Sequence, residues 1–315
     1  MNRSARCNGI DRLTEAIKRT KNPTVAGLDT LLEYLPESFR DKFAGKWNQK
    51  GIWTFDLAAQ AITEFNKLLI DALCDIVPAV KIQAACYEMY GLPGMKAFMD
   101  TINYAKFKGM LVISDVKRGD IGSSAQCYSA AHIGRTAMFD VRESAFDSDF
   151  ATVNAYLGED GITPFIKDCA KFDKGIFILA KTSNPSSSDL QDLDLCGKPL
   201  YWHTMKLIKK WGEDYIGKNG YSLAGAVVGA TYPKQSRELR KAFPGVFFLV
   251  PGYGAQGANA KDVSGCFDEN GLGAIINASR SLICAYKTQG TEDFAVAARA
   301  EAIKMRDDIN HELKL

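Results

Sequence analysis

The sequence predicts an α/β protein built as one (β/α)₈ TIM barrel over residues 1–315, a single domain with two inserted loops. Eight short runs rich in Val, Ile, Leu and Ala recur along the chain, and stretches with helical periodicity separate them. Parallel neighbours need a crossover connection, so this alternation favours a parallel sheet. Eight such units close a barrel, and 315 residues fit one barrel with insertions.

Each predicted strand is bounded by Gly, Pro or polar residues, as expected of short strands buried on both faces. The eight strands are predicted at Thr24–Asp29, Pro78–Ile82, Met110–Asp115, Phe150–Asn154, Gly175–Lys181, Leu223–Ala230, Val246–Pro251 and Gly273–Ala278. Helices are predicted between and after them at Leu57–Cys74, Met89–Phe107, Gly161–Phe172, Pro199–Ile216, Pro233–Phe243 and Thr291–Leu313.

Two predicted connections, Thr30–Phe55 and Asn184–Lys198, are longer than ordinary loops. Connections of this length in a compact domain are usually lids, interface elements or mobile segments. Composition leaves these three possibilities open for both insertions.

The composition is that of a globular protein with a substantial core, at 46% hydrophobic and 24% charged residues. The net charge of +2 provides no broad basic field for a nucleic-acid polymer. The eight cysteines form no Cys-x-x-Cys pair, and neither a signal peptide nor an 18-residue apolar run is present. We therefore expect a cytoplasmic protein with reduced thiols, no zinc site of that spacing and no membrane partner, whose anionic partner, if it has one, is small and locally bound.

Charged residues stand at the carboxyl ends of several predicted strands, where barrel active sites lie. They are Asp29, Lys81, Asp115, Lys117, Lys181 and Arg280. Strand side chains alternate between faces, so Asp115 and Lys117 should share the face of the barrel mouth. An exposed ion pair of this spacing would contribute only about 0–1 kcal/mol. Burying such charges costs several kcal/mol per ion unless they pair, so the array indicates a functional role.

The segment Pro251-Gly-Tyr-Gly-Ala-Gln-Gly257 directly follows the seventh predicted strand. Its glycines match the G-x-G-x-x-G dinucleotide pattern, but that pattern belongs after the first strand of a doubly wound sheet. In barrels, the loops after strands seven and eight often bind phosphate, and Arg280 could supply a bidentate contact. The alternatives are a tight turn without a ligand and, for Arg280, a surface ion pair.

Other polar residues carry a weaker signal. Lys181-Thr-Ser-Asn-Pro185 could present hydroxyl and amide groups to a heterocycle, or could be a turn that enters a loop. Thr152 and Asn154 have no role that their residue types single out. His132 is expected to be a packed or surface histidine rather than a catalyst.

The motif Asp115-Val-Lys117-Arg-Gly-Asp120-Ile121 resembles the Asp-x-Lys-x-x-Asp-Ile signature of the orotidine 5′-phosphate decarboxylase family, in its longer bacterial-type subgroup. Supporting stretches run from about Val25 to Tyr286. They are Val25–Asp29, Ala79–Lys81, Thr152–Asp160, Lys181–Pro185, Val227–Thr231, Pro251–Gly257 and Asn277–Arg280.

The resemblance implies a homodimeric barrel that converts orotidine 5′-monophosphate to uridine 5′-monophosphate and CO₂, with no metal or organic cofactor. Carried over by position, Lys117 would donate the proton and Asp115 would lie against the substrate carboxylate. Lys81 and Asp29 would hold the ribose and the charge chain, and Asp120 would reach the partner subunit's site. Ser183 would contact the pyrimidine, while Gln256 and Arg280 would grip the phosphate.

Four positions depart from the family pattern and leave loop shape open: Tyr253, Ala155, Ser186 and Ser281. Two alternatives remain. A related Mg²⁺-dependent sugar-phosphate decarboxylase or aldolase would carry a metal-binding glutamate at the position of Lys81, where an ammonium would repel the metal. A non-catalytic nucleotide-binding barrel would not need both Asp115 and Lys117.

Overall fold

The computed structural model describes residues 7–47 and 53–315, which form a closed barrel of eight parallel strands. Around the barrel the strand order is β1-β12-β11-β10-β7-β6-β3-β2. The strands are β1 (Thr24–Gly27), β2 (Ala79–Gln83), β3 (Leu111–Arg118), β6 (Phe150–Val153), β7 (Gly175–Lys181), β10 (Ala224–Val228), β11 (Phe248–Pro251) and β12 (Ala274–Ala278). Every predicted strand is therefore confirmed, with ends that differ by up to three residues.

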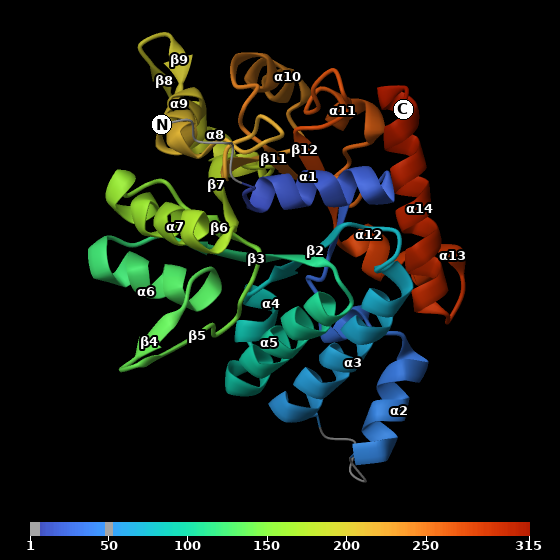
Figure 1. Ribbon diagram of the computed structural model, residues 1–315. Coiled ribbons are helices and arrows are strands. Elements are labelled where there is room, and N and C mark those ends of the chain that lie inside the picture. The colour runs from blue at the N-terminus through green and yellow to red at the C-terminus, as the bar shows by residue number, and fades with distance from the viewer. Residues whose placement is uncertain (1–6, 48–52) are drawn as a thin grey trace.

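Helices surround the barrel, as Figure 1 shows. The longer ones are α3 (Phe55–Leu73), α5 (Gly91–Phe107), α6 (Gly122–His132), α7 (Glu159–Phe172), α9 (Leu200–Gly212), α10 (Pro233–Ala242) and α14 (Phe294–Leu313). Short helices are α4 (Ala85–Glu88), α11 (Ala260–Ser264), α12 (Arg280–Ile283) and α13 (Ala285–Gln289).

Helix ends differ from the predicted ones for local reasons. The helix predicted from Met89 begins at Gly91, which has a φ of 62° and separates it from α4. The helix predicted to Ile216 ends as α9 at Gly212 and continues as the 3₁₀ turn η3 (Glu213–Tyr215). The helix predicted from Thr291 starts at Phe294, because the Asp293 carboxylate accepts the N–H of Val296.

Helix α1 (Gly9–Thr20), which was not predicted, lies across the amino-terminal end of the barrel (Figure 1). Its buried face, which includes Ile10, Leu13 and Ile17, packs in one cluster with the side chains that fill the barrel interior. Asn8 caps the helix by accepting the N–H of Asp11. The helix therefore closes the end of the barrel opposite the carboxyl ends of the strands.

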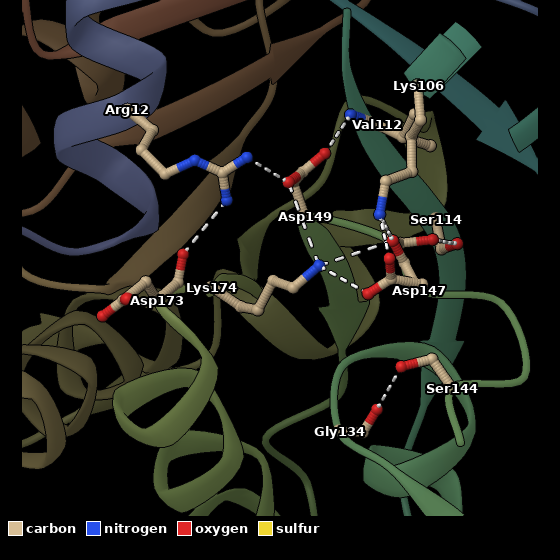
Figure 2. A network of polar contacts seen from close by, with 11 residues as sticks. Arg12, Lys106, Val112, Ser114, Gly134, Ser144, Asp147, Asp149, Asp173 and Lys174 are labelled. Carbon is tan, nitrogen blue, oxygen red and sulfur yellow. Dashed lines mark hydrogen bonds and ion pairs between the residues drawn. The ribbon is translucent and has the colours of Figure 1, made fainter. Parts of the chain in front are cut away.

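A network of ion pairs and hydrogen bonds joins the elements at this closed end (Figure 2). The buried Asp149 carboxylate accepts the Val112 N–H at 2.9 Å and the Arg12 guanidinium at 2.6 Å. Lys174 and Lys106 both pair with Asp147. The network includes residues of α1 and β3 and residues directly before β6 and β7. It therefore links the amino-terminal ends of these strands, at the end of the barrel opposite their carboxyl ends.

Both predicted insertions contain secondary structure. The first carries η1 (Leu32–Tyr34) and α2 (Glu37–Trp47), and its residues 48–52 lie outside the described part. The second folds as η2 (Pro185–Ser187), α8 (Ser188–Gln191) and the hairpin β8 (Asp194–Leu195) and β9 (Lys198–Pro199), which stands away from the barrel in Figure 1. A further hairpin, β4 (Thr136–Met138) and β5 (Val141–Glu143), was not predicted and projects beside α6. Among the described helices, none is long and apolar enough to cross a membrane.

Candidate active site

A cavity of about 520 Å³ opens at the carboxyl ends of the barrel strands. Seven of the eight predicted site residues line it: Asp29, Lys81, Asp115, Lys117, Ser183, Gln256 and Arg280. They come from loops and strand ends that are far apart in the sequence and that the closed barrel brings together. The cavity is therefore where the predicted site residues meet.

The cavity contains a chain of alternating charges. Lys81 Nζ lies 2.8 Å from Asp115 Oδ2 and 3.3 Å from Asp29 Oδ1. Lys117 Nζ lies 2.7 Å from Asp115 Oδ1. The Lys81 and Asp115 side chains are buried, whereas the Lys117 side chain is 45% exposed. The two ammonium groups and two carboxylates neutralise one another, and only the Lys117 ammonium keeps broad access to the cavity.

Burial and charge act in opposite directions on this chain. Burial alone would raise the pKa of the Asp115 carboxyl, but the ammonium groups of Lys81 and Lys117 outweigh it and hold that pKa well below its ordinary value. Burial alone would lower the pKa of Lys81, but the carboxylates of Asp115 and Asp29 raise it above the ordinary lysine value. Both groups are therefore ionised at neutral pH.

Asp115 and Lys117 share the cavity, as predicted, but not by simple alternation along a strand. The pairing of β3 with β6 is irregular between Ser114 and Arg118, and Lys117 has a φ of 44°. For a non-glycine residue this left-handed conformation is unfavourable and needs support from its surroundings. The carboxyl end of β3 therefore holds a strained lysine at the cavity.

Two residues that the sequence did not single out hold the Asp115 carboxylate. The Thr152 hydroxyl donates to Asp115 Oδ1 at 2.8 Å and accepts the N–H groups of Val116 and Lys117 at 2.9 Å each. Gln83 Nε2 donates to Asp115 Oδ2 at 3.0 Å. A usable signal existed: each lies two residues beyond an interior-facing residue of its strand, as Thr152 does beyond Phe150.

The opposite side of the cavity is built from Ser183, the loop after β11 and the end of β12. Gly252, Gly254 and Gly257 all have positive φ. A Cβ on Gly252 would lie 3.1 Å from Gln256 Oε1 and 3.3 Å from Ser183 Cβ, so the absence of a side chain lets these residues converge. Arg280 is exposed at the rim, at the start of α12.

Asn277 and Ser279 also line the cavity and were not predicted as site residues. Each holds a buried side-chain oxygen with no hydrogen-bond partner among the described residues, Asn277 Oδ1 and Ser279 Oγ. Buried polar atoms are rarely left without a partner, so both are candidates for contact with a bound molecule or water.

Lys181 and Asp120 do not line the cavity. Lys181 was placed with the charged residues at the mouth, which is wrong: its side chain is fully buried outside the cavity and pairs with Asp192. The pairing of β7 with β10 shifts register at Lys181, so alternation from Leu179 fails there. Asp120 does not line the cavity of its own chain, and its Oδ1 accepts the N–H of Ile121.

The glycine loop and His132 do not act as a dinucleotide site or a catalyst. The closed barrel is not the doubly wound sheet that a dinucleotide fingerprint requires, so the glycine loop is not such a site. His132 is buried and its ring stacks on Phe146, which agrees with the packed histidine expected. Across residues 7–47 and 53–315, no three His, Cys, Asp or Glu side chains gather closely enough to hold a metal ion.

Comparisons with known proteins show the family and agree with the barrel fold. Residues 57–291 match the model of the "Orotidine 5′-phosphate decarboxylase / HUMPS family". An orotidine 5′-phosphate decarboxylase of Caldicellulosiruptor bescii is 41% identical over 303 residues, covering 96% of this chain and 98% of that protein. One from Rhodopirellula baltica is 42% identical over 307 residues, covering 95% and 97%. The structure of Leishmania donovani OMP decarboxylase superimposes with a TM-score of 0.73 at 28% identity, covering 98% of this chain and 100% of that one.

Proposed function

Because this chain belongs to the orotidine 5′-phosphate decarboxylase / HUMPS family, we propose that it converts orotidine 5′-monophosphate to uridine 5′-monophosphate and CO₂ without a metal or organic cofactor. Relatives of 40% identity and above are named orotidine 5′-phosphate decarboxylases, and a decarboxylase is a carboxy-lyase. This chain is therefore a carboxy-lyase. The observation that carries the proposal is the Lys117 ammonium, held 2.7 Å from the buried Asp115 carboxylate in a cavity with cationic and amide groups opposite.

The chemistry requires a protonated group at the carbon that loses CO₂. Departure of CO₂ leaves an electron pair in an sp² orbital that cannot delocalise into the ring π system, so the protein must stabilise it directly. Lys117, partly exposed to the cavity and oriented by Asp115, would stabilise the carbanion and then give it a proton. The C–C electron pair becomes the new C–H bond, and the lysine regains its proton from solvent.

Asp115 would lie against the substrate carboxylate. Two like charges about 4 Å apart at an effective dielectric near 20 repel by roughly 4 kcal/mol, which limits what this crowding can supply. Enzymes lower barriers by up to roughly 23 kcal/mol in the common range, so the larger share must come from Lys117 and from binding of distant substrate groups.

Those distant groups are the ribose and the phosphate. Asp29 and Lys81 would hold the ribose hydroxyls while completing the charge chain. Ser183 would contact the pyrimidine, next to Gln256 in the cavity wall. Gln256 and Arg280 would bind the phosphate at the rim. Closure of the Pro251–Gly257 loop over that phosphate would exclude water from the reaction.

The proposal includes a homodimer with shared active sites, and the position of Asp120 supports it. Its side chain lies outside its own cavity, and the surface carries exposed apolar residues that a second subunit could cover. These are Ile121, Phe139 at the tip of the β4–β5 hairpin, Tyr156 and Leu157, each at least 48% exposed. In such a dimer, Asp120 of one protomer would enter the site of the other and extend its charge chain.

The direct test mixes the purified protein with orotidine 5′-monophosphate in EDTA and follows the pyrimidine absorbance. We expect conversion to uridine 5′-monophosphate that EDTA does not slow. Activity lost in EDTA and restored by Mg²⁺ would favour the related Mg²⁺-dependent decarboxylases or aldolases. Those enzymes would carry a metal-binding glutamate at the position of Lys81. Binding of the nucleotide without turnover would leave a regulatory barrel.

A further inference from the structure

The second insertion returns to the active site and holds the residues that follow β7. Helix α8 ends at Gln191, whose side-chain amide reaches back to Thr182. Thr182, Ser183 and Asn184 line the cavity in succession. We propose that Gln191 is a positioning residue that fixes this segment so that Ser183 faces the pyrimidine; the inference rests on the proposed function of Ser183.

The contact between Gln191 and Thr182 is reciprocal. Gln191 Oε1 accepts the backbone N–H of Thr182 at 2.8 Å, and Gln191 Nε2 donates to the Thr182 hydroxyl, also at 2.8 Å. The same hydroxyl donates to Asn184 Oδ1 at 2.6 Å. The Gln191 amide therefore fixes the backbone of Thr182, directly before Ser183. Through the Thr182 hydroxyl it also orients the side chain of Asn184, directly after Ser183.

Ser183 is restrained on its other sides as well. The Thr231 hydroxyl donates to its carbonyl oxygen at 3.1 Å. A Cβ on Gly229 would lie 2.8 Å from the Ser183 backbone, so the segment rests directly on the end of β10. Without Gln191, these contacts would still hold Ser183 itself, but the Thr182 N–H directly before it would lose its acceptor.

A buried lysine anchors the insertion that carries Gln191. Lys181 Nζ lies 2.7 Å from Asp192 Oδ1 and 3.0 Å from Ser187 Oγ. Its ammonium also lies 4.3 Å from the centroid of the Tyr232 ring. These contacts grip the insertion on both sides of α8, and they account for a fully buried lysine that the decarboxylation does not use.

The effect should be specific for the part of the ligand that Ser183 contacts. Ribose 5-phosphate carries the groups assigned to Asp29, Gln256 and Arg280 but has no pyrimidine. A shift of Ser183 should therefore weaken reaction of the whole nucleotide and leave binding of ribose 5-phosphate intact. General damage to the barrel would instead weaken both.

The experiment compares kcat and KM for orotidine 5′-monophosphate with the inhibition constant of ribose 5-phosphate. Gln191→Ala should lower kcat/KM about tenfold, as for loss of partly buried hydrogen bonds, and keep the inhibition constant within about twofold. Gln191→Glu, which keeps the acceptor for the Thr182 N–H, should recover part of the loss. Leu190→Ala, an exposed neighbour on the same helix, is the matched control and should behave as the unaltered protein.

A double-variant cycle guards against misfolding as an explanation. Thr182→Val removes the hydroxyl, and Thr182→Val/Gln191→Ala should lose hardly more than the worse single variant, because both disrupt one contact. Unchanged kcat/KM in Gln191→Ala, or equal loss for nucleotide and ribose 5-phosphate, would overturn the inference. If the unaltered protein does not turn over the nucleotide at all, the proposed function fails and the inference falls with it.

Discussion

The Thr152 hydroxyl joins the Asp115 carboxylate, at 2.8 Å, to the backbone N–H of Lys117, at 2.9 Å. One side chain on β6 thus fixes both the carboxylate that orients Lys117 and the strained backbone, with a φ of 44°, from which Lys117 projects. The relation between Asp115 and Lys117 therefore depends on a neighbouring strand as well as on their own.

Thr152→Val should lower kcat at least tenfold and destabilise the fold by about 1–3 kcal/mol, because the buried N–H of Val116 and the partly buried N–H of Lys117 lose their acceptor while side-chain volume is kept. Steady-state kinetics and urea unfolding measure the two effects. Thr14→Val is the control: this buried hydroxyl in α1 donates only within its helix, so its loss should spare kcat. Full activity in Thr152→Val would remove Thr152 from the positioning of Lys117.

Arg280→Ala should weaken uridine 5′-monophosphate binding roughly 10- to 100-fold, the effect of losing charged hydrogen bonds, and should leave uridine binding almost unchanged. Calorimetric titration of both ligands measures the difference. Arg306→Ala, on α14, is a charge-matched control and should change neither affinity. Equal weakening of nucleotide and nucleoside would move Arg280 out of the phosphate site.

Lys117→Ala and Asp120→Ala homodimers should each be inactive, yet mixing them after dissociation should restore activity. Half of randomly reassociated dimers are mixed, and each mixed dimer has one intact site, so roughly a quarter of the unaltered activity is expected. The decarboxylation assay on the reassociated mixture measures it. A mixture as inactive as its components would place Asp120 in its own subunit's site, or in none.

Acid should destabilise the fold partly through His132. Burial, with a smaller contribution from the Arg118 charge, lowers the pKa of His132 from 6.5 to about 4. Between these values the unfolded chain binds a proton that the folded protein does not, so stability present above pH 6.5 is lost as the pH falls towards 4.

Urea unfolding at pH 7 and pH 4.5 measures the free energy of unfolding of the unaltered protein and of His132→Phe. From pH 7 to pH 4.5, the unaltered protein should lose about 2–3 kcal/mol more of this free energy than the variant loses. The phenyl ring can keep the stack on Phe146. His311→Phe, at an exposed position, should follow the unaltered protein's pH dependence. The same acid loss in His132→Phe as in the unaltered protein would contradict the buried, neutral histidine.

The barrel could be predicted from the sequence because parallel strands buried on both faces are continuous apolar runs, such as Gly175–Lys181, which matches β7 residue for residue. Helix α1 was missed although its first residues carry a capping pattern, Asn8 with Asp11. The prediction from strand alternation that Lys181 lies at the barrel mouth was wrong, because the pairing of β7 with β10 shifts register there. A register shift depends on both paired strands and cannot be seen in the sequence of either one alone.

The site was predictable in part for the same reason. Strand ends identify which residues reach the mouth, so Asp29, Lys81 and Asp115 could be grouped from sequence. Strand alternation places Thr152 and Gln83 on the interior face of the barrel, but their contacts with Asp115 depend on a neighbouring strand and cannot be seen in either strand alone. Gln191 depends on an insertion that folds back, which composition does not report.

The most direct test of the account is the rate of Lys117→Ala with saturating orotidine 5′-monophosphate, alongside a check by circular dichroism and nucleotide binding that the variant is folded. Of the two lysines in the charge chain, Lys117 is the one whose side chain is partly exposed to the cavity. Its removal should abolish decarboxylation, while the fold and the binding of the nucleotide through its phosphate persist. A folded Lys117→Ala protein that turns over at close to the unaltered rate would contradict the assignment of Lys117 as the proton donor.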